Sequence, residues 1–236
     1  SAGNWSLIVM SFSEVSKLCL AFGDCNTEGF RTLEGPVWAE QVAGALALEF
    51  KNCGHTMSTT RELLQYAAAF PPSEYALVFI QYGLVDSWLT FRGAPYVLYY
   101  PDNPRRKLAR KLVKKLKKWA RSLQLQKRLG AVEQVPLEEY IENVRTVLKS
   151  APGSQFVLVA TAPNRDTSRN PRILRYNTAL SNLAGEEHNA IYADAWDELW
   201  SNLDACLMDD GTHLTPQGHR VVADCVQSAL RHGSLR

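Results

Sequence analysis

Short apolar runs that alternate with helical segments constrain the fold of this chain more than any other feature of its sequence. Each run is continuous rather than alternating, which is typical of a strand that is buried on both faces of a parallel sheet. Strands are therefore expected at residues 17–22, 75–81, 155–160 and 190–193. The segments between them carry apolar residues three and four positions apart, which predicts helices at residues 36–51, 59–70, 137–149 and 173–184, and a last one from about residue 215.

This alternation predicts an α/β protein, with three layers (α/β/α) around a parallel sheet. Its 236 residues fit one domain with a large core, and residues 1–236 contain neither a repeat nor a linker that would divide them. Apolar runs stay shorter than the roughly 18 residues of a membrane-spanning helix, and we expect no secretory leader in the sequence given. Five cysteines without close pairing favour reduced thiols, so we expect a cytoplasmic protein without a metal site.

Charge is distributed unevenly along the chain. The segment that begins at Arg105 and ends at Arg128 holds twelve of the 26 Lys and Arg residues and no Asp or Glu, so the other fourteen basic residues are outnumbered by 24 acidic ones. An apolar stripe runs through the same segment at helical spacing. Its members are Leu108, Leu112, Leu116, Trp119 and Leu123. The pattern predicts a basic amphipathic helix within about residues 104–130.

Two interpretations of this helix are open. We expect the apolar stripe to dock on the sheet and to leave a solvated basic face. Twelve uncompensated charges exceed what solubility requires, and our hypothesis is that the helix recruits an anionic surface or polymer near the functional site, with peripheral membrane association as one form. Nucleic acid is not an expected partner, because the rest of the chain is acidic and offers no aromatic stacking platform.

The residues that follow each strand are the candidates for chemistry, because ligands of parallel sheets bind outside the carboxyl ends of the strands. The first strand is followed by residues 23–29, Gly-Asp-Cys-Asn-Thr-Glu-Gly, which present Cys25 at a turn. Asp24 and Asn26 are expected to hold that turn by bonds to the backbone. A nucleophile needs a base and the base an orienting group, and His213 lies three residues after Asp210 just before the last helix.

Four blocks occur in an order that resembles the SGNH/GDSL hydrolase superfamily of esterases, lipases, thioesterases and carbohydrate deacetylases. They are residues 23–29, 52–54, 82–86 and 210–213. The resemblance extends from Leu18 to the C-terminal helix, and it implies a flavodoxin-like fold and an activity that needs no metal or cofactor.

The resemblance assigns a role to five residues. Cys25 matches the nucleophilic serine of the family, His213 the general base, and Asp210 the carboxylate that orients it. The backbone N–H groups of Cys25 and Gly54 match two oxyanion-hole donors. Val85 stands where the family has an asparagine side chain, and losing one such donor costs on the order of 2.7–4 kcal/mol. Other donors from Tyr82, Gln81, His55 or Asn164 are the candidates to replace it.

A cysteine nucleophile changes the expected chemistry. A helix N-terminus or an adjacent protonated histidine lowers a thiol pKa from about 8.5, so we expect a reactive thiolate at Cys25. Its acyl intermediate would be a thioester, which favours transfer to an amine, alcohol or thiol as well as hydrolysis. The leading hypothesis is a hydrolase or acyltransferase that acts on acyl esters or thioesters through Cys25, His213 and Asp210.

The substrate class and two alternatives stay open at this stage. The acyl group could be carried by a small molecule, a carbohydrate, a lipid or a carrier. Because Cys25 and Val85 both depart from the family pattern, one alternative is a catalytically impaired domain that binds acylated or anionic ligands. The other is an esterase whose serine was replaced by engineering.

Overall fold

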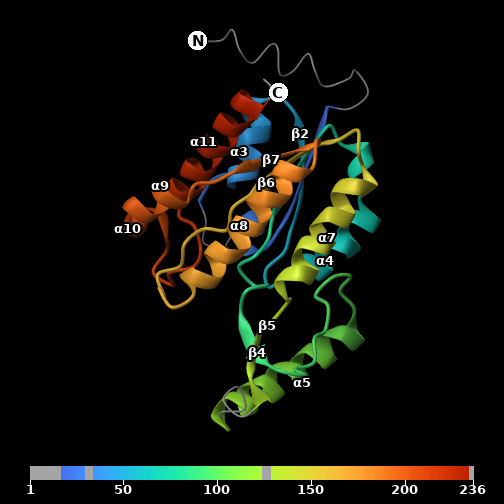
Figure 1. The fold of residues 1–236 in the computed structure, drawn as a ribbon, viewed down its shortest axis with the longest axis vertical. Helices are drawn as coiled ribbons and strands as arrows, with labels where there is room; N and C mark the ends of the chain where they lie inside the picture. Colours follow the sequence, from blue (N-terminus) through green and yellow to red (C-terminus); the bar gives the residue numbers. More distant parts are fainter. Residues whose placement is uncertain (1–16, 30–33, 124–128, 234–236) are drawn as a thin grey trace.

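A five-stranded parallel sheet forms the centre of the computed structural model, which describes residues 17–29, 34–123 and 129–233 (Figure 1). Its strands run in the order β2-β1-β3-β6-β7, and each neighbouring pair is parallel. Their bounds are β1 Leu18–Gly23, β2 Glu49–Gly54, β3 Leu77–Gln81, β6 Gln155–Val159 and β7 Ala190–Ala193. Counted along the chain this is the order 2-1-3-4-5 of flavodoxin-like folds, in which the ligand site lies between the first and third strands.

Helices cover both faces of the sheet (Figure 1). One face packs against α3 (Trp38–Ala45) and α11 (Pro216–Gly233), with the short α9 (Trp196–Ser201) and α10 (Leu203–Cys206) beside them. The other face packs against α4 (Thr60–Ala69), α7 (Leu137–Ser150) and α8 (Asn170–Glu186). Alternate residues of β1 enter the two cores: Cys19 and Ala21 one, Leu20 and Phe22 the other. The predicted three-layer α/β architecture is confirmed.

The strand β2 corrects the sequence prediction, which extended a helix over residues 36–51. The helix α3 ends at Ala45, and residues 49–54 form an edge strand paired with β1. The sequence of β2 is Glu-Phe-Lys-Asn-Cys-Gly, and Cys53 is its one buried residue. An edge strand with exposed faces lacks the continuous apolar run that marked the central strands.

A smaller unit extends from the main body at the lower end of Figure 1. It contains the antiparallel pair β4 (Leu89–Phe91) and β5 (Ala131–Glu133) and the helix α5 (Pro104–Ser122). Asn103 caps α5, since its Oδ1 accepts the Arg106 N–H at 2.9 Å, and proline occupies the first helical position. The two remaining short elements are α2 (Cys25–Glu28) and the 3₁₀ turn η1 (Pro72–Glu74).

The apolar stripe of α5 does not dock on the sheet, so that expectation is wrong. The exposed fractions of its five members lie between 37% and 61%. The helix instead turns Val113 and Ala120 inward, and the Arg110 guanidinium donates to the carbonyl of Leu98 at 3.0 Å. Residues 124–128, the end of the predicted basic segment, lie outside the described residues. Within those residues, none of the helices combines the length and apolar character needed to cross a membrane.

Candidate active site

Cys25 is the first residue of α2, immediately after the carboxyl end of β1. Asp24 caps the helix, because its Oδ1 accepts the Asn26 N–H at 3.0 Å, as predicted for this turn. Gly23 allows the chain to turn so tightly: a Cβ at this position would lie 2.0 Å from Thr27 Oγ1 and 2.8 Å from the Gln81 carbonyl oxygen. The β1–α2 connection therefore places Cys25 at the switch point of the sheet.

The Cys25 thiol is buried, with an exposed fraction of 6%, and packs with Leu84, Ile173 and Trp196. Burial raises its pKa, and the negative charge of the Asp24 carboxylate raises it further. The backbone N–H groups of Cys25 and Asn26 favour the thiolate but do not outweigh these effects. The expectation of a lowered thiol pKa is therefore wrong, because the surroundings of Cys25 raise its pKa and disfavour the thiolate.

His213 and Asp210 form a hydrogen-bonded pair in the loop before α11. His213 Nδ1 lies 2.5 Å from Asp210 Oδ2, and Asp210 Oδ1 accepts the backbone N–H groups of Thr212 and His213 at 2.9 and 3.0 Å. Burial acts to raise the pKa of Asp210, but these hydrogen bonds outweigh it and the pKa is lowered. An ionised Asp210 that accepts from Nδ1–H selects the tautomer in which Nε2 carries no proton.

Asn26 connects the Cys25 turn to the His213 loop. Its Nδ2 donates to the Thr212 carbonyl at 3.2 Å, and its Oδ1 accepts the Leu214 N–H at 3.0 Å. One buried side chain therefore holds the peptide groups on both sides of His213. Sequence reasoning gave Asn26 a role within its own turn and missed this one, because both partners lie far away in the sequence.

Gly54 is the last residue of β2 and Val85 lies in the loop after β3, the two strands that flank β1. A Cβ at Gly54 would lie 2.3 Å from the Glu28 backbone nitrogen, so glycine permits the close approach of the end of β2 to α2. The Gly54 N–H donates to Asn52 Oδ1 at 2.8 Å. Val85 is buried, and it forms part of the wall of a pocket. Oxyanion binding by the N–H groups of Cys25 and Gly54 stays a prediction.

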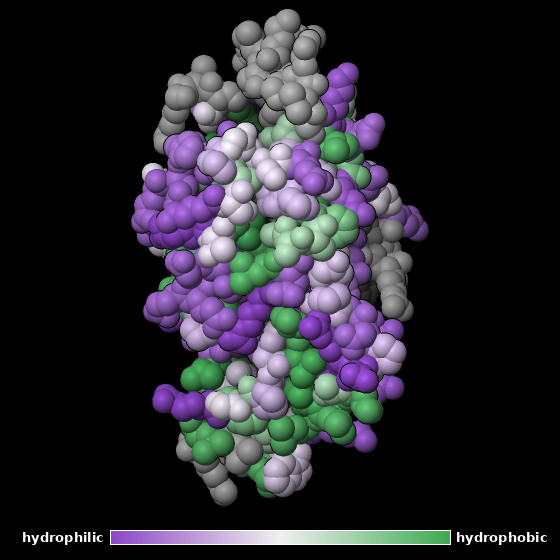
Figure 2. All heavy atoms as spheres, turned by 90° about the vertical axis from the view of Figure 1, so that its right-hand side faces the viewer, coloured by the Kyte–Doolittle hydropathy of each residue, from purple (hydrophilic) through white to green (hydrophobic). Residues whose placement is uncertain are grey.

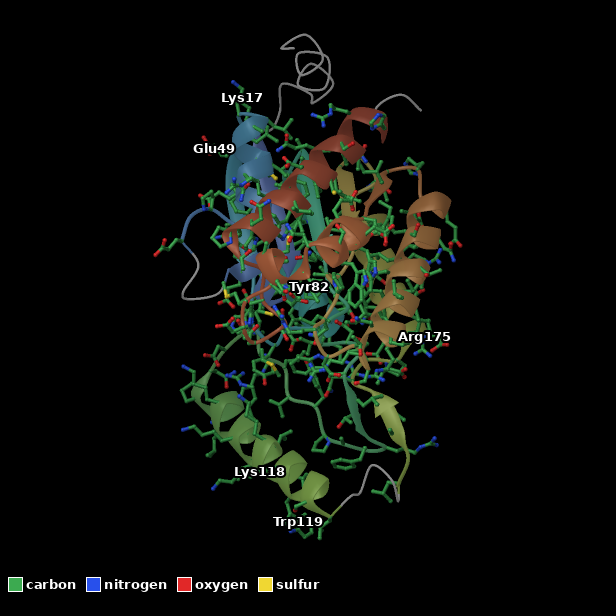
Figure 3. All side chains as sticks on the ribbon, turned by 90° about the vertical axis from the view of Figure 1, so that its left-hand side faces the viewer. Lys17, Glu49, Tyr82, Lys118, Trp119 and Arg175 are labelled. Carbon is green, nitrogen blue, oxygen red and sulfur yellow. The ribbon has the colours of Figure 1, made fainter. Side chains whose placement is uncertain are left out.

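The four side chains considered as replacements for the family's asparagine are buried in the core or already have hydrogen-bond partners within the protein. Gln81 donates to the Ala160 carbonyl and accepts from Trp38 Nε1 and Thr27 Oγ1. Asn164 Nδ2 donates to Thr212 Oγ1 at 3.0 Å. Tyr82 is fully buried in the core between the sheet and α7 and is labelled in Figure 3. His55 is half-buried, and its Nδ1 lies 2.8 Å from the Thr56 carbonyl oxygen.

A pocket of about 460 Å³ lies beside these loops. Met57 and Val85 line it on the side of the main sheet, and Arg110, Lys114 and Lys118 of α5 line the opposite part. Cys25 and His213 do not line it; the pocket reaches the candidate site at Val85. Its wall combines apolar, aromatic and basic side chains, which suits a ligand with both apolar and anionic parts.

The buried Glu62 at the start of α4 holds one rim of this pocket. It completes a capping box with Thr59, and it accepts the Tyr96 hydroxyl at 2.6 Å and the Tyr99 N–H at 2.7 Å. Across the described part of the chain, no group of three or more His, Cys, Asp or Glu side chains is arranged to bind a metal ion.

Comparison with solved structures identifies proteins of the same fold. One is an acetylxylan esterase from Geobacillus stearothermophilus, with a TM-score of 0.61, 17% identity, and coverage of 90% of this chain and 93% of that one. Its catalytic mutants include replacements of a serine, an aspartate and a histidine. Another is a GDSL-like lipase described as putative, from Parabacteroides merdae, with a TM-score of 0.61, 15% identity, and coverage of 93% and 98%.

A third solved structure is LAE5, an α/β hydrolase enzyme from the metagenome of Lake Arreo, with a TM-score of 0.59, 19% identity, and coverage of 90% and 94%. A search of curated proteins finds no match. The model of the GDSL-like lipase/acylhydrolase family matches residues 21–221, which include the Cys25 turn, the β3 loop and the Asp210–His213 pair. The chain belongs to the GDSL-like lipase/acylhydrolase family.

Proposed function

We propose that this protein is an acyl ester hydrolase in which Cys25 is the nucleophile, His213 the general base and Asp210 the residue that orients His213. The observation that carries the proposal is the Asn26 side chain, which ties the turn of Cys25 to the peptide groups on both sides of His213. The short Asp210–His213 contact supports the same assignment, because it holds the imidazole in the tautomer that accepts a proton at Nε2.

The reaction proceeds in two steps. In the first, His213 Nε2 accepts the thiol proton while the Cys25 sulfur attacks the ester carbonyl carbon. The bond to the leaving alcohol then breaks, the alcohol takes the proton from His213, and a thioester remains on Cys25. In the second step His213 deprotonates water, which attacks the thioester and releases the carboxylic acid and the thiol. An amine, alcohol or thiol in place of water makes the same step an acyl transfer.

General-base assistance is central to this mechanism because burial raises the pKa of the Cys25 thiol. A buried thiol with a raised pKa behaves more like a serine hydroxyl than like a preformed thiolate, and it depends on His213 for activation. Oxyanion stabilisation would come from the backbone N–H groups of Cys25 and Gly54, the second of which must first release its bond to Asn52 Oδ1. Because Val85 cannot donate, we expect a slower enzyme than one with an asparagine at this position.

Acylated carbohydrates are the first substrates to test, since a solved structure of the same fold is an acetylxylan esterase. The apolar and basic wall of the pocket also suits acyl groups borne by a lipid or a carrier with an anionic part. Acyl thioesters belong in the same panel because a thioester is the expected intermediate.

A catalytically impaired domain that binds acylated ligands is the second candidate. The presence of Val85 and the engagement of the Gln81 and Asn164 amides by the protein favour it. The same test separates the two: initial rates on p-nitrophenyl acetate, acetylated xylo-oligosaccharides and a short acyl thioester. If the protein is an ester hydrolase, we expect turnover that is lost in both Cys25→Ala and His213→Ala.

Matched controls make that test specific. Cys225→Ala and His188→Ala change the same residue types outside the site and are expected to keep the wild-type rate. An absence of turnover on the whole panel, together with saturable binding of an acylated ligand, would instead establish the binding domain. Fast hydrolysis by Cys25→Ser, and slow hydrolysis by the wild type, would identify an esterase whose serine has been replaced.

A further inference from the structure

The helix α5 exposes an apolar surface that the described parts of the chain do not cover. Ten large hydrophobic side chains are exposed in the described parts of the chain, and five of them form the stripe of α5. Leu108, Leu112, Leu116, Trp119 and Leu123 fall within a sector of about 80° on an ideal helix. Single exposed leucines are ordinary, whereas a contiguous apolar patch marks an interaction surface. In Figure 2, hydrophobic residues gather at the lower end of the molecule beside hydrophilic ones.

Exposed lysines lie directly beside this stripe. Lys111, Lys114, Lys115 and Lys118 are exposed and occupy the neighbouring sector of the helix. The ion pairs that the described side chains of α5 make are those of Lys107 and Arg110, and both end on Asp102. The helix carries no acidic residue. The outward surface therefore combines apolar side chains with uncompensated positive charge.

Hydrogen bonds from two arginines of α5 fix the orientation of the helix. The Arg110 side chain, 13% exposed, donates to the carbonyls of Leu98 and Tyr99 and to Asp102, and Arg106 donates to the Pro101 carbonyl. These bonds hold one face of the helix against the 98–102 loop. The stripe is left on the outside, and in Figure 3 Trp119 points away from the body of the molecule.

We propose that α5 is an interfacial helix that binds the surface of an anionic lipid bilayer. Leucine and tryptophan side chains would enter the boundary between headgroups and acyl chains, while the adjacent lysines contact anionic headgroups. A soluble acidic polymer would match the lysines but would leave the apolar stripe in water. With 19 residues the helix is about 28 Å long, enough to lie along the membrane plane.

This proposal goes beyond the ester chemistry and does not depend on it. Because Arg110, Lys114 and Lys118 also line the pocket, binding through α5 would bring the pocket close to the lipid surface. An acylated substrate held in or on the membrane would then be captured from that surface.

Co-sedimentation of the full chain with vesicles tests the proposal. Vesicles of phosphatidylcholine containing phosphatidylglycerol are expected to bind the protein, vesicles of phosphatidylcholine alone to bind it at least tenfold more weakly, and added salt to reduce the binding. The variant L112Q/L116Q/W119Q is expected to lose at least tenfold in affinity. The variant K111Q/K115Q is expected to lose about thirtyfold. None of these five residues lines the pocket, so hydrolysis of a soluble ester should not change in either variant.

Two controls complete the experiment. The variant L174Q/W200Q removes exposed apolar side chains elsewhere on the protein and is expected to bind vesicles like the wild type. Dextran sulfate serves as a soluble acidic polymer. Equal binding to neutral and anionic vesicles, absence of vesicle binding, or an equal loss in L174Q/W200Q would overturn the proposal. So would tight binding to dextran sulfate that survives L112Q/L116Q/W119Q while vesicles are not bound.

Discussion

Replacing Asn26 by alanine tests how the two halves of the candidate active site are held together. The substitution removes the bonds to the Thr212 carbonyl and the Leu214 N–H, at 3.2 and 3.0 Å. Leu214 is fully buried, so its N–H would be left without a partner at a cost of about 1–3 kcal/mol. Thr212 is half-buried, so water can replace part of the second bond. We expect the free energy of unfolding to fall by about 2–3 kcal/mol.

The effect of this variant on activity should exceed its effect on folding. A displacement of His213 by about 1 Å costs on the order of a hundredfold in rate, which corresponds to about 2.7 kcal/mol of activation free energy. We therefore expect kcat on p-nitrophenyl acetate to fall about a hundredfold in Asn26→Ala, with a smaller change in KM. Urea unfolding measured on the same preparation separates folding from catalysis, and kcat is compared where each variant is folded.

Asn189→Ala is the matched control for this experiment. Asn189 is also buried, and its Nδ2 donates to two backbone carbonyls, those of Leu148 and Ala151, each at 3.2 Å. It lies just before β7, which is an edge strand of the sheet, at the amino-terminal end of that strand, whereas Cys25 follows the carboxyl end of β1. We expect a similar loss of stability with wild-type kcat. If kcat were the same in Asn26→Ala and Asn189→Ala, the claim that Asn26 positions His213 would be wrong.

Three further predictions follow from the site. The substitution Val85→Asn introduces a side-chain hydrogen-bond donor that valine lacks, and it is expected to raise kcat by up to about a hundredfold. Val85→Thr is measured beside it as a control. An unchanged or lower kcat in Val85→Asn would show that this position does not face the oxyanion. Because the pKa of the Cys25 thiol is raised, iodoacetamide should alkylate Cys25 slowly at pH 7, and the alkylation rate should still rise with pH beyond 8.5. Mass spectrometry of the Cys25 peptide follows the reaction. An alkylation rate that reaches its plateau below pH 7 would indicate a preformed thiolate. Burial raises the pKa of the Asp86 carboxyl from 3.8 to about 7, so the folded state favours the protonated carboxyl. This preference stabilises the folded state by up to about 4 kcal/mol below about pH 4, and the stabilisation is lost as the pH rises to about 7. Asp86→Asn should remove that contribution, measured by urea unfolding at pH 5 and pH 8, and an equal pH dependence in wild type and variant would contradict the shift.

The central sheet could be predicted from the sequence because its strands are buried on both faces. The runs at β1, β3, β6 and β7 are continuous and apolar for that reason, and their predicted bounds agree with the structure within about two residues at each end. The edge strand β2 carries no such signal, and β4 and β5 have three residues each, stabilised by a pairing between distant segments. Local periodicity contains no information about that pairing.

The candidate site was predicted in part. The spacing of Asp210 and His213 places both in one turn, and the structure has the expected contact between them. The raised pKa of Cys25 and the role of Asn26 depend on what packs around the turn, which one sequence does not reveal. The same holds for α5: a docked and an exposed amphipathic helix share one periodicity, and the bonds of Arg110 decide which face turns inward.

The central claim is that Cys25 forms an acyl intermediate with the help of His213, and intact mass spectrometry tests it most directly. The protein is mixed with p-nitrophenyl acetate, quenched in acid at short times, and the mass and the Cys25 peptide are analysed. We expect one added acetyl group on Cys25 that forms and decays within turnover, is absent in Cys25→Ala, and forms far more slowly in His213→Ala. Turnover without an adduct on Cys25, or an adduct that forms equally fast without His213, would contradict it.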